Sequence, residues 1–208
     1  MRVVIPVANE ERNRSLAYAL ASIRKHTDLD PVTVGGRDFG LCDHIDTGEG
    51  RSNAYSKFNG EATAMRTAIH TIGETFVWSN DDVYWLRPSE PIRWALGDLT
   101  ADSRRSVYMQ RKHATAHALR AAGLPTYDYE SHTPLTITPK HMLEALDWCD
   151  SNPQLDKRSV YGNLTGLPDL IAPDVKVRTR RDPLPDAPWA SSNGSPTTWP
   201  ALMAALNA

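Results

Sequence analysis

Two adjacent aspartates are the first residues in this sequence whose type and position could support chemistry. Asp81 and Asp82 follow the apolar run 75–78, with Ser79 and Asn80 in between. Two carboxylates this close repel each other unless a proton or a cation lies between them. Hard cations such as Mg²⁺ and Mn²⁺ prefer oxygen ligands and accept phosphate oxygens to complete their shell, so we predict a metal at Asp81 and Asp82. The alternative is an acidic turn or a helix N-cap without a ligand.

Two further side chains could act on a hydroxyl or a phosphate. His132 could accept a proton at neutral pH, since histidine has a reference pKa of about 6.5. The alternative is a buried histidine that packs beside Pro134. Arg158 could bind a phosphate, because its rigid guanidinium matches two oxygens. The alternative is a solvated surface arginine, and we expect 161–163 to form a turn beside it.

The elements that must position these residues alternate between strand and helix. Apolar patterns and helical spacing predict strands over 2–7, 32–34 and 75–78, and helices over 16–23, 52–72, 104–122 and 139–149. This alternation predicts an α/β fold with a mostly parallel central sheet flanked by helices. Ligands of such sheets bind at the carboxyl ends of the strands, where the polar loops 8–12, 35–38 and 79–82 would face one crevice.

Length and composition favour one compact protein without a membrane span. The 208 residues suit one domain, which we place at 1–181, with a Pro- and Ser-rich tail at 182–208 that packs on it or extends from it. No apolar run reaches the roughly 18 to 20 residues of a membrane helix, and the chain opens on a strand-like segment. The net charge of −2 gives no general attraction to nucleic acid. The two cysteines, Cys42 and Cys149, form no CxxC motif, which favours a cytoplasmic location.

Several motifs resemble known transferases. The opening segment VVIPVANEE at 3–11 resembles the first strand of nucleotide-sugar-dependent glycosyltransferases of the GT-A fold. A stronger likeness is to the Stealth family of sugar-phosphate transferases, and the motifs that carry it keep the family's order: SLAYALASI at 15–23, KFNG at 57–60, FVWSNDDVYWLRP at 76–88 and HTP at 132–134. The segment RSVYGN at 158–163 resembles small, often bacteriophage-encoded relatives, which would place the protein in a host cytoplasm. The family's helix arginine is Ala21 here, and its Phe-Asn-Ser ends in Gly60.

The resemblance implies a GT-A-like enzyme that needs Mg²⁺ or Mn²⁺ and a nucleotide-sugar donor. It would transfer a sugar or a sugar-1-phosphate to a hydroxyl on a glycan, a protein or a modified nucleic acid. In such a site Asp81 and Asp82 hold the metal on the donor diphosphate, His132 is the general base, and Arg158 contacts phosphate. The residues expected to bind the donor are Pro6, Asn9, Glu10, Arg12, Arg37, Asn59 and Asn80.

Two other functions stay open from the sequence. One is a non-catalytic carbohydrate- or nucleotide-binding module, in which the acidic turn is structural and His132 packs in the core. The other is a bacteriophage glycosyltransferase that modifies nucleic-acid bases. Basic patches at 104–105, 111–112 and 176–181 could then approach an anionic acceptor, although such runs are usually solvated.

Overall fold

The protein is described here from a computed structural model, which covers residues 1–7, 15–48, 57–101, 106–179, 182–192 and 196–207. The chain divides into two compact units. The first unit comprises Met1–Pro91, His132–Thr136 and Val175–Ala208, and the second comprises Ile92–Ser131 and Ile137–Asp174. No described helix combines the length and the apolar character that a membrane crossing requires.

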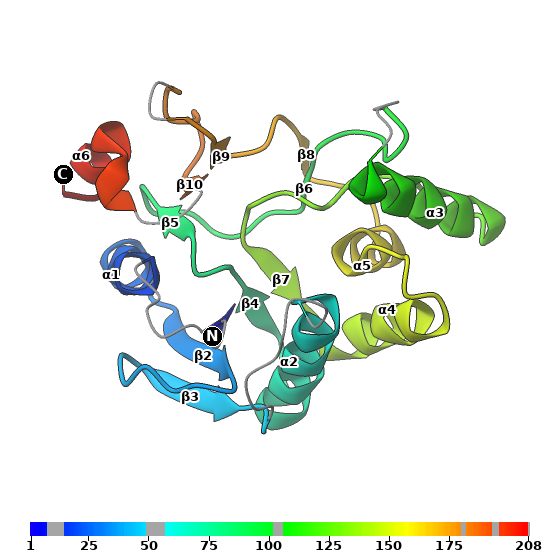
Figure 1. The fold of residues 1–208 in the computed structure, drawn as a ribbon, viewed down its shortest axis with the longest axis horizontal. Helices are drawn as coiled ribbons and strands as arrows, with labels where there is room; N and C mark the ends of the chain where they lie inside the picture. Colours follow the sequence, from blue (N-terminus) through cyan, green and yellow to red (C-terminus); the bar gives the residue numbers. More distant parts are fainter. Residues whose placement is uncertain (8–14, 49–56, 102–105, 180–181, 193–195, 208) are drawn as a thin grey trace. The chain divides into compact units, whose positions relative to one another are not determined.

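The first unit is built on a five-stranded sheet with the strand order β3-β2-β1-β4-β7 (Figure 1). The strands are β1 (Arg2–Pro6), β2 (Asp30–Gly35), β3 (Asp43–Asp46), β4 (Phe76–Trp78) and β7 (Leu135–Ile137). Strand β1 runs parallel to both β2 and β4, and β2 runs parallel to β3. The predicted α/β fold with a mostly parallel sheet is therefore confirmed.

Two helices cover opposite sides of this sheet, α1 (Leu16–His26) and α2 (Lys57–Ile72) (Figure 1). The apolar stripe of α1 is buried, as its spacing of three and four residues predicts. Helix α2 stops at Gly73, whose φ of +72° is a conformation that favours glycine. Local periodicity and a stop residue are thus sufficient to predict both helices in the described part of the chain.

A second sheet of the first unit joins the segment after β4 to the C-terminal part of the chain. Its strands are β5 (Val83–Trp85), β10 (Trp189–Ser192) and β9 (Lys176–Val177), in the order β5-β10-β9. Helix α6 (Pro200–Asn207) follows a short 3₁₀ helix at Pro196–Thr198. Tyr84, Ala190, Trp199 and Leu202 share one buried cluster, so this stretch after residue 181 contributes to the core of the unit. The boundary predicted at residue 181 stays a prediction.

The second unit is mainly helical. It contains α3 (Val107–Ala121), α4 (Pro139–Ser151) and α5 (Lys157–Thr165), with α5 packed against both other helices. A two-stranded parallel sheet pairs β6 (Trp94–Ala95) with β8 (Leu170–Ile171). Gly123 has a φ of +71° just after α3, in agreement with its predicted role as a helix stop.

The predicted turn at 161–163 is wrong, because these residues lie inside α5. The ring of Tyr129 packs so closely on Gly162 that a Cβ there would be 2.3 Å from the ring atom Cδ2. The Asn163 amide accepts a hydrogen bond from Tyr127 N at 3.0 Å and donates one to Tyr127 O at 2.8 Å. Contacts from outside the helix thus override the local turn preference of Gly and Asn.

The substitution Gly162→Ala is expected to lower the free energy of unfolding by about 1 to 3 kcal/mol, because the new methyl group overlaps the Tyr129 ring. Urea denaturation would measure this. The sign of the change is informative, since Gly→Ala in an unobstructed helix raises stability by roughly 0.5 to 1 kcal/mol. In a Tyr129→Ala background the penalty should disappear, and a penalty of equal size in both backgrounds would show that the ring is not its cause.

Candidate functional site

The strands β1, β2 and β4 end at one edge of the first sheet. Just beyond these strands, Val7 N donates to Val34 O at 2.9 Å, and Ser79 N donates to Val4 O at 3.0 Å. The chain therefore leaves the three parallel strands side by side, at the edge where open α/β sheets bind their ligands. The polar loops after β2 and β4 start there as predicted, and the loop after β1 lies outside the described residues.

The acidic turn connects β4 to β5, and both of its aspartates are half-buried. Val83 N donates to Asn80 O at 3.2 Å, which closes the turn. Ser192 N donates to Asp82 O at 3.3 Å, which ties the turn to the end of β10. The backbone of the turn is thus held by hydrogen bonds on two sides, which fixes the point from which the two carboxylates project.

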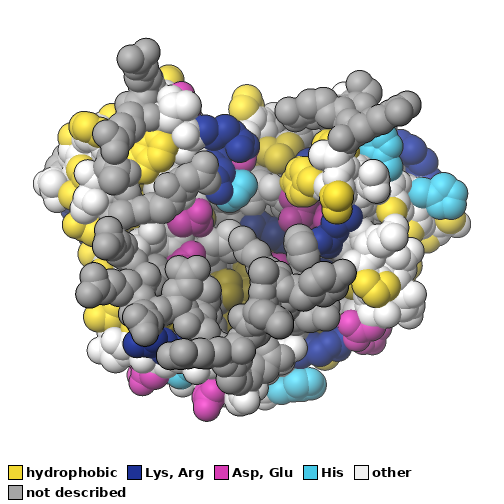
Figure 2. Space-filling model, viewed as in Figure 1, with side chains coloured by type: hydrophobic (Ala, Val, Ile, Leu, Met, Phe, Trp, Pro, Cys, Tyr) yellow, Lys and Arg dark blue, Asp and Glu magenta, His cyan; other side chains and the backbone are white. Residues whose placement is uncertain are grey.

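Lys176 connects the acidic turn to the predicted base. Its Nζ lies 3.7 Å from Asp82 Oδ2 and 3.1 Å from His132 Nε2. The side chains of Lys176 and Asp82 are only 13% and 22% exposed. Figure 2 shows acidic, basic and histidine side chains next to one another in the left half of the view. Asp82 and His132, which are 50 residues apart in the sequence, are therefore brought to one place.

The position of Lys176 follows from the register of the second sheet. Ser191 of β10 is paired with Val83 of β5 on one side and with Lys176 of β9 on the other. Lys176 therefore lies in the same row of paired residues as Val83, which directly follows Asp82. In the sequence Lys176 belongs only to the basic stretch 176–181, because no local pattern reveals a contact that depends on strands this short.

A buried tyrosine hydroxyl adjoins the site. The Tyr84 hydroxyl lies 3.4 Å from Ser192 Oγ. Burial raises the pKa of Tyr84 to about 12, and the nearby charges of Asp82 and Asp81 act in the same direction, whereas hydrogen bonds from Ser192 and Ser15 oppose it. Tyr84 is therefore a neutral hydroxyl at physiological pH. It can donate a hydrogen bond, but it cannot serve as a base.

The donor set of the acidic turn fits an ion whose shell is completed by a substrate. Mg²⁺ is commonly held by one or two carboxylates together with phosphate oxygens, and Asp81 and Asp82 offer two carboxylates. Within the described residues, no three His, Cys, Asp or Glu side chains lie close enough together to hold a metal ion. Phosphate oxygens and water would therefore have to supply the remaining ligands.

The other predicted donor-binding residues occupy different places. Pro6 ends β1 opposite Val34, and Asn80 directly precedes the two aspartates. Arg37 follows β2 on an exposed stretch, where its guanidinium lies 5.5 Å from the centre of the Phe39 ring. Asn59 lies in the first turn of α2, and its side chain is outside the described part. Asn9, Glu10 and Arg12 also lie outside the described residues.

Arg158 belongs to the second unit, where it occupies the first turn of α5. Its side chain is buried, so the alternative of a solvated surface arginine is wrong. The position is buried because α5 packs against α3 and α4. The predicted phosphate contact of Arg158 stays a prediction.

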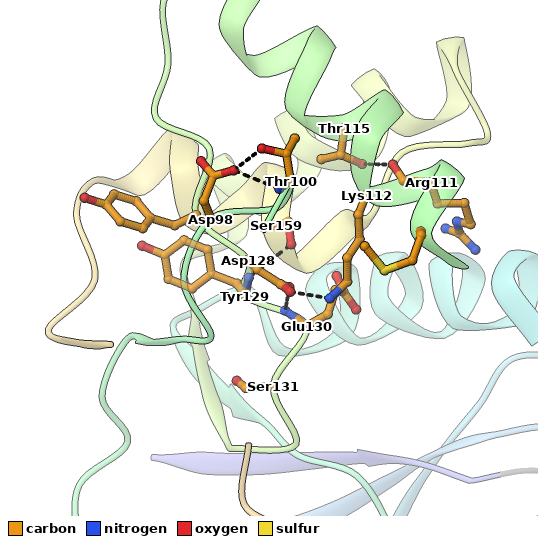
Figure 3. Close-up of polar contacts among 12 residues, drawn as sticks. Asp98, Thr100, Arg111, Lys112, Thr115, Asp128, Tyr129, Glu130, Ser131 and Ser159 are labelled. Carbon is orange, nitrogen blue, oxygen red and sulfur yellow. Dashed lines mark hydrogen bonds and ion pairs between the residues drawn. The ribbon is translucent and has the colours of Figure 1, made fainter. Parts of the chain in front are cut away.

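The second unit contains a buried network of charged side chains (Figure 3). Lys112 forms an ion pair with Asp128, and their side chains are 10% and 6% exposed. Arg111 Nε lies 3.3 Å from Asp156 Oδ1. The basic patch predicted at 111–112 is therefore wrong, because both cations turn into the unit and pair with carboxylates there.

Burial and pairing shift two pKa values in this network. Burial raises the pKa of Asp156 to about 6, although the positive charge of Arg111 opposes the shift. Burial alone would lower the pKa of Lys112, but the hydrogen bond to Asp128 and its negative charge raise it on balance. The pairing thus favours the charged form of Lys112, whereas burial brings the pKa of Asp156 to about 6.

Comparisons with known proteins support the fold. No protein-family model and no curated protein match the sequence. Among solved structures, the chain is similar to that of the galactosyltransferase LgtC, determined in complex with donor and acceptor sugar analogs. The match covers 100% of this chain and 95% of that chain, with a TM-score of 0.50 and 12% sequence identity. At this identity the likeness shows the fold, so the predicted GT-A-like architecture is confirmed, while the resemblance to the Stealth family stays a prediction.

Proposed function

We propose that this protein is a GT-A-type glycosyltransferase that transfers a sugar, or a sugar-1-phosphate, from a nucleotide-sugar to a hydroxyl group. The main observation behind the proposal is that Lys176 contacts both Asp82 and His132 beside the carboxyl end of β4. Three segments that are distant in the sequence therefore supply polar side chains at this edge of the sheet. The likeness in fold to a galactosyltransferase supports the same class of reaction.

The proposed roles follow from the chemistry of each side chain. Asp81 and Asp82 hold Mg²⁺ or Mn²⁺, which when bound neutralises negative charge on the donor diphosphate. His132 takes the proton of the acceptor hydroxyl. Arg158 contacts a phosphate of the donor or acceptor. Donor contacts are proposed for Pro6, Asn9, Glu10, Arg12, Arg37, Asn59 and Asn80.

The two possible transfers differ in the bond that breaks. Transfer of a sugar breaks the bond between the anomeric carbon and the phosphate oxygen, and a nucleoside diphosphate leaves. Transfer of a sugar-1-phosphate breaks the anhydride bond between the two phosphates, and a nucleoside monophosphate leaves. The likeness to the Stealth family favours transfer of a sugar-1-phosphate, and the departures at Ala21 and Gly60 weaken that likeness.

Incubation with Mn²⁺ and a panel of nucleotide-sugars would test the proposed function. Calorimetry would report donor binding, and phosphorus NMR would identify the released nucleotide, with a chelator as the control. A diphosphate indicates sugar transfer. A monophosphate indicates sugar-phosphate transfer if the sugar-phosphate appears on an added hydroxyl acceptor rather than free in solution. If no donor binds, the proposal is contradicted and a module with another ligand is favoured.

The substitution Asp82→Asn is expected to lower metal-dependent donor turnover by about a hundredfold or more, because the amide carries no charge for the cation. Turnover is measured by released nucleotide, and the melting temperature checks the fold. Asp186→Asn is the matched control, since Asp186 is an exposed carboxylate of the same unit, paired only with exposed Arg87 among the described ion pairs. Equal turnover in the two variants would remove Asp82 as a metal ligand.

A further inference from the structure

Lys176 lies between two groups that the proposed reaction needs. Its Nζ is 3.1 Å from His132 Nε2 and 3.7 Å from Asp82 Oδ2. The lysine side chain is only 13% exposed, so little water competes with these two contacts. The backbone of Lys176 is held at the start of β9 by its pairing with Ser191 of β10, so its side chain starts from a defined position.

The contact with Lys176 determines which ring nitrogen of His132 carries the proton. An ammonium group donates hydrogen bonds and accepts none. A neutral imidazole can satisfy this contact only when Nε2 of His132 is the acceptor and its proton is on Nδ1. In this state the Nε2 lone pair is occupied by Lys176 and cannot take a proton from an acceptor hydroxyl.

The charge of Lys176 also affects the acidic turn. Its ammonium group already pairs with Asp82, the carboxylate proposed to hold a divalent cation. Two cations close together repel each other, and the repulsion is stronger where burial limits screening by water. Lys176 and a divalent cation therefore compete for Asp82.

We propose that Lys176 is a positioning residue that bridges Asp82 and His132 in the cation-free protein and leaves both when a divalent cation binds at Asp82. Departure of the ammonium group exposes Nε2 of His132, so the base becomes available only when the metal is in place. The inference rests on the proposed function, and it assigns a regulatory role within that site to a residue that belongs to no recognisable motif.

Mg²⁺ binding to the full chain, measured by calorimetry without any donor, tests the competition. Lys176→Met is expected to tighten Mg²⁺ binding about fivefold or more, which is the usual lower range for coupling between two ligands of a protein. Lys176→Arg retains the positive charge and should bind Mg²⁺ like the wild type. Arg178→Met is the matched control for net charge, since Arg178 is an exposed cation two residues along the chain. Equal affinity in Lys176→Met and Arg178→Met would overturn the competition.

Nitrogen NMR of ¹⁵N-histidine-labelled protein tests the bridge without metal. The His132 signals are assigned by their loss in His132→Gln. The wild type and Lys176→Arg should show the Nδ1–H tautomer at His132, and Lys176→Met should lose it. Saturation of the wild type with Mg²⁺ should shift the Nε2 signal in the same direction as Lys176→Met. A tautomer that is the same in wild type and Lys176→Met would overturn the bridge.

The two measurements separate this inference from the proposed function. If neither the wild type nor any variant binds Mg²⁺, the metal assignment at Asp82 is wrong, and so is the proposed departure of Lys176 on cation binding. If Mg²⁺ binds but neither its affinity nor the His132 tautomer depends on Lys176, the metal assignment stands and the role of Lys176 fails.

Discussion

The substitution Lys112→Met is expected to lower the free energy of unfolding by about 3 to 5 kcal/mol, the usual cost of removing one partner from a buried ion pair. Lys112 and Asp128 are both almost completely buried, and the Lys112 ammonium also lies 4.5 Å from the centre of the Tyr108 ring. Methionine fills much of the lysine volume, so the loss reports the uncompensated charge of Asp128 rather than an empty space. Urea denaturation at neutral pH would measure the change.

Two further variants identify the cause of this loss. Arg120→Met removes an exposed cation from the same helix, where Arg120 Nη2 lies 3.7 Å from Asp98 Oδ1 and the two side chains are 55% and 45% exposed. Solvent screens this pair, so the change should stay below about 1 kcal/mol. The double variant Lys112→Met/Asp128→Asn removes both charges and should recover part of the loss. Similar losses for Lys112→Met and Arg120→Met would show that burial of the pair has no special effect.

Local sequence patterns predict three of the five strands of the central sheet, β1, β2 and β4, and miss β3 and β7. The strands near residues 2–7, 32–34 and 75–78 are recognised as apolar runs that end at polar loops, and the helix after residue 16 is recognised by its spacing. The strands β5, β9 and β10 contain two to four residues each, and no flanking helix or loop pattern marks them as strands in the sequence. Strands β5 and β10 pair Trp85 with Trp189 and Tyr84 with Ala190, and all four residues are buried. Strand β9 adds to this sheet through its pairing with β10.

The sequence predicts those residues of the candidate site whose function is suggested by their own type and their immediate neighbours. Adjacent aspartates after an apolar strand indicate Asp82, and the resemblance of the motif at 132–134 indicates His132. Lys176 could not be found in this way, because its role depends on the register of β9 with β10. Adjacent basic residues are equally ambiguous, since Arg111 and Lys112 look like a solvated pair in the sequence and are ion-paired inside the second unit.

The contribution of Asp156 to stability is expected to fall as the pH rises through about 6. Burial raises the pKa of Asp156 from 3.8 to about 6. Between these values the folded protein binds more protons than the unfolded chain, so the free energy of unfolding decreases with increasing pH. The contribution is fully present below pH 3.8 and is lost above about pH 6. A shift of about two pKa units corresponds to roughly 3 kcal/mol.

The substitution Asp156→Asn separates the pH-dependent contribution of Asp156 to the free energy of unfolding from those of all other titrating groups. Asparagine resembles the protonated carboxyl group in shape and charge, so wild type and variant should have similar stability near pH 4. At about pH 7.5 the variant should be more stable relative to the wild type by roughly 3 kcal/mol, measured as the difference between urea unfolding free energies at the two pH values. Glu144→Gln, an exposed carboxyl group on α4 of the same unit, should show no such dependence. If the difference for Asp156→Asn reverses its sign, the attraction of Arg111 rather than burial determines the ionisation of Asp156, and this carboxylate stabilises the unit at neutral pH.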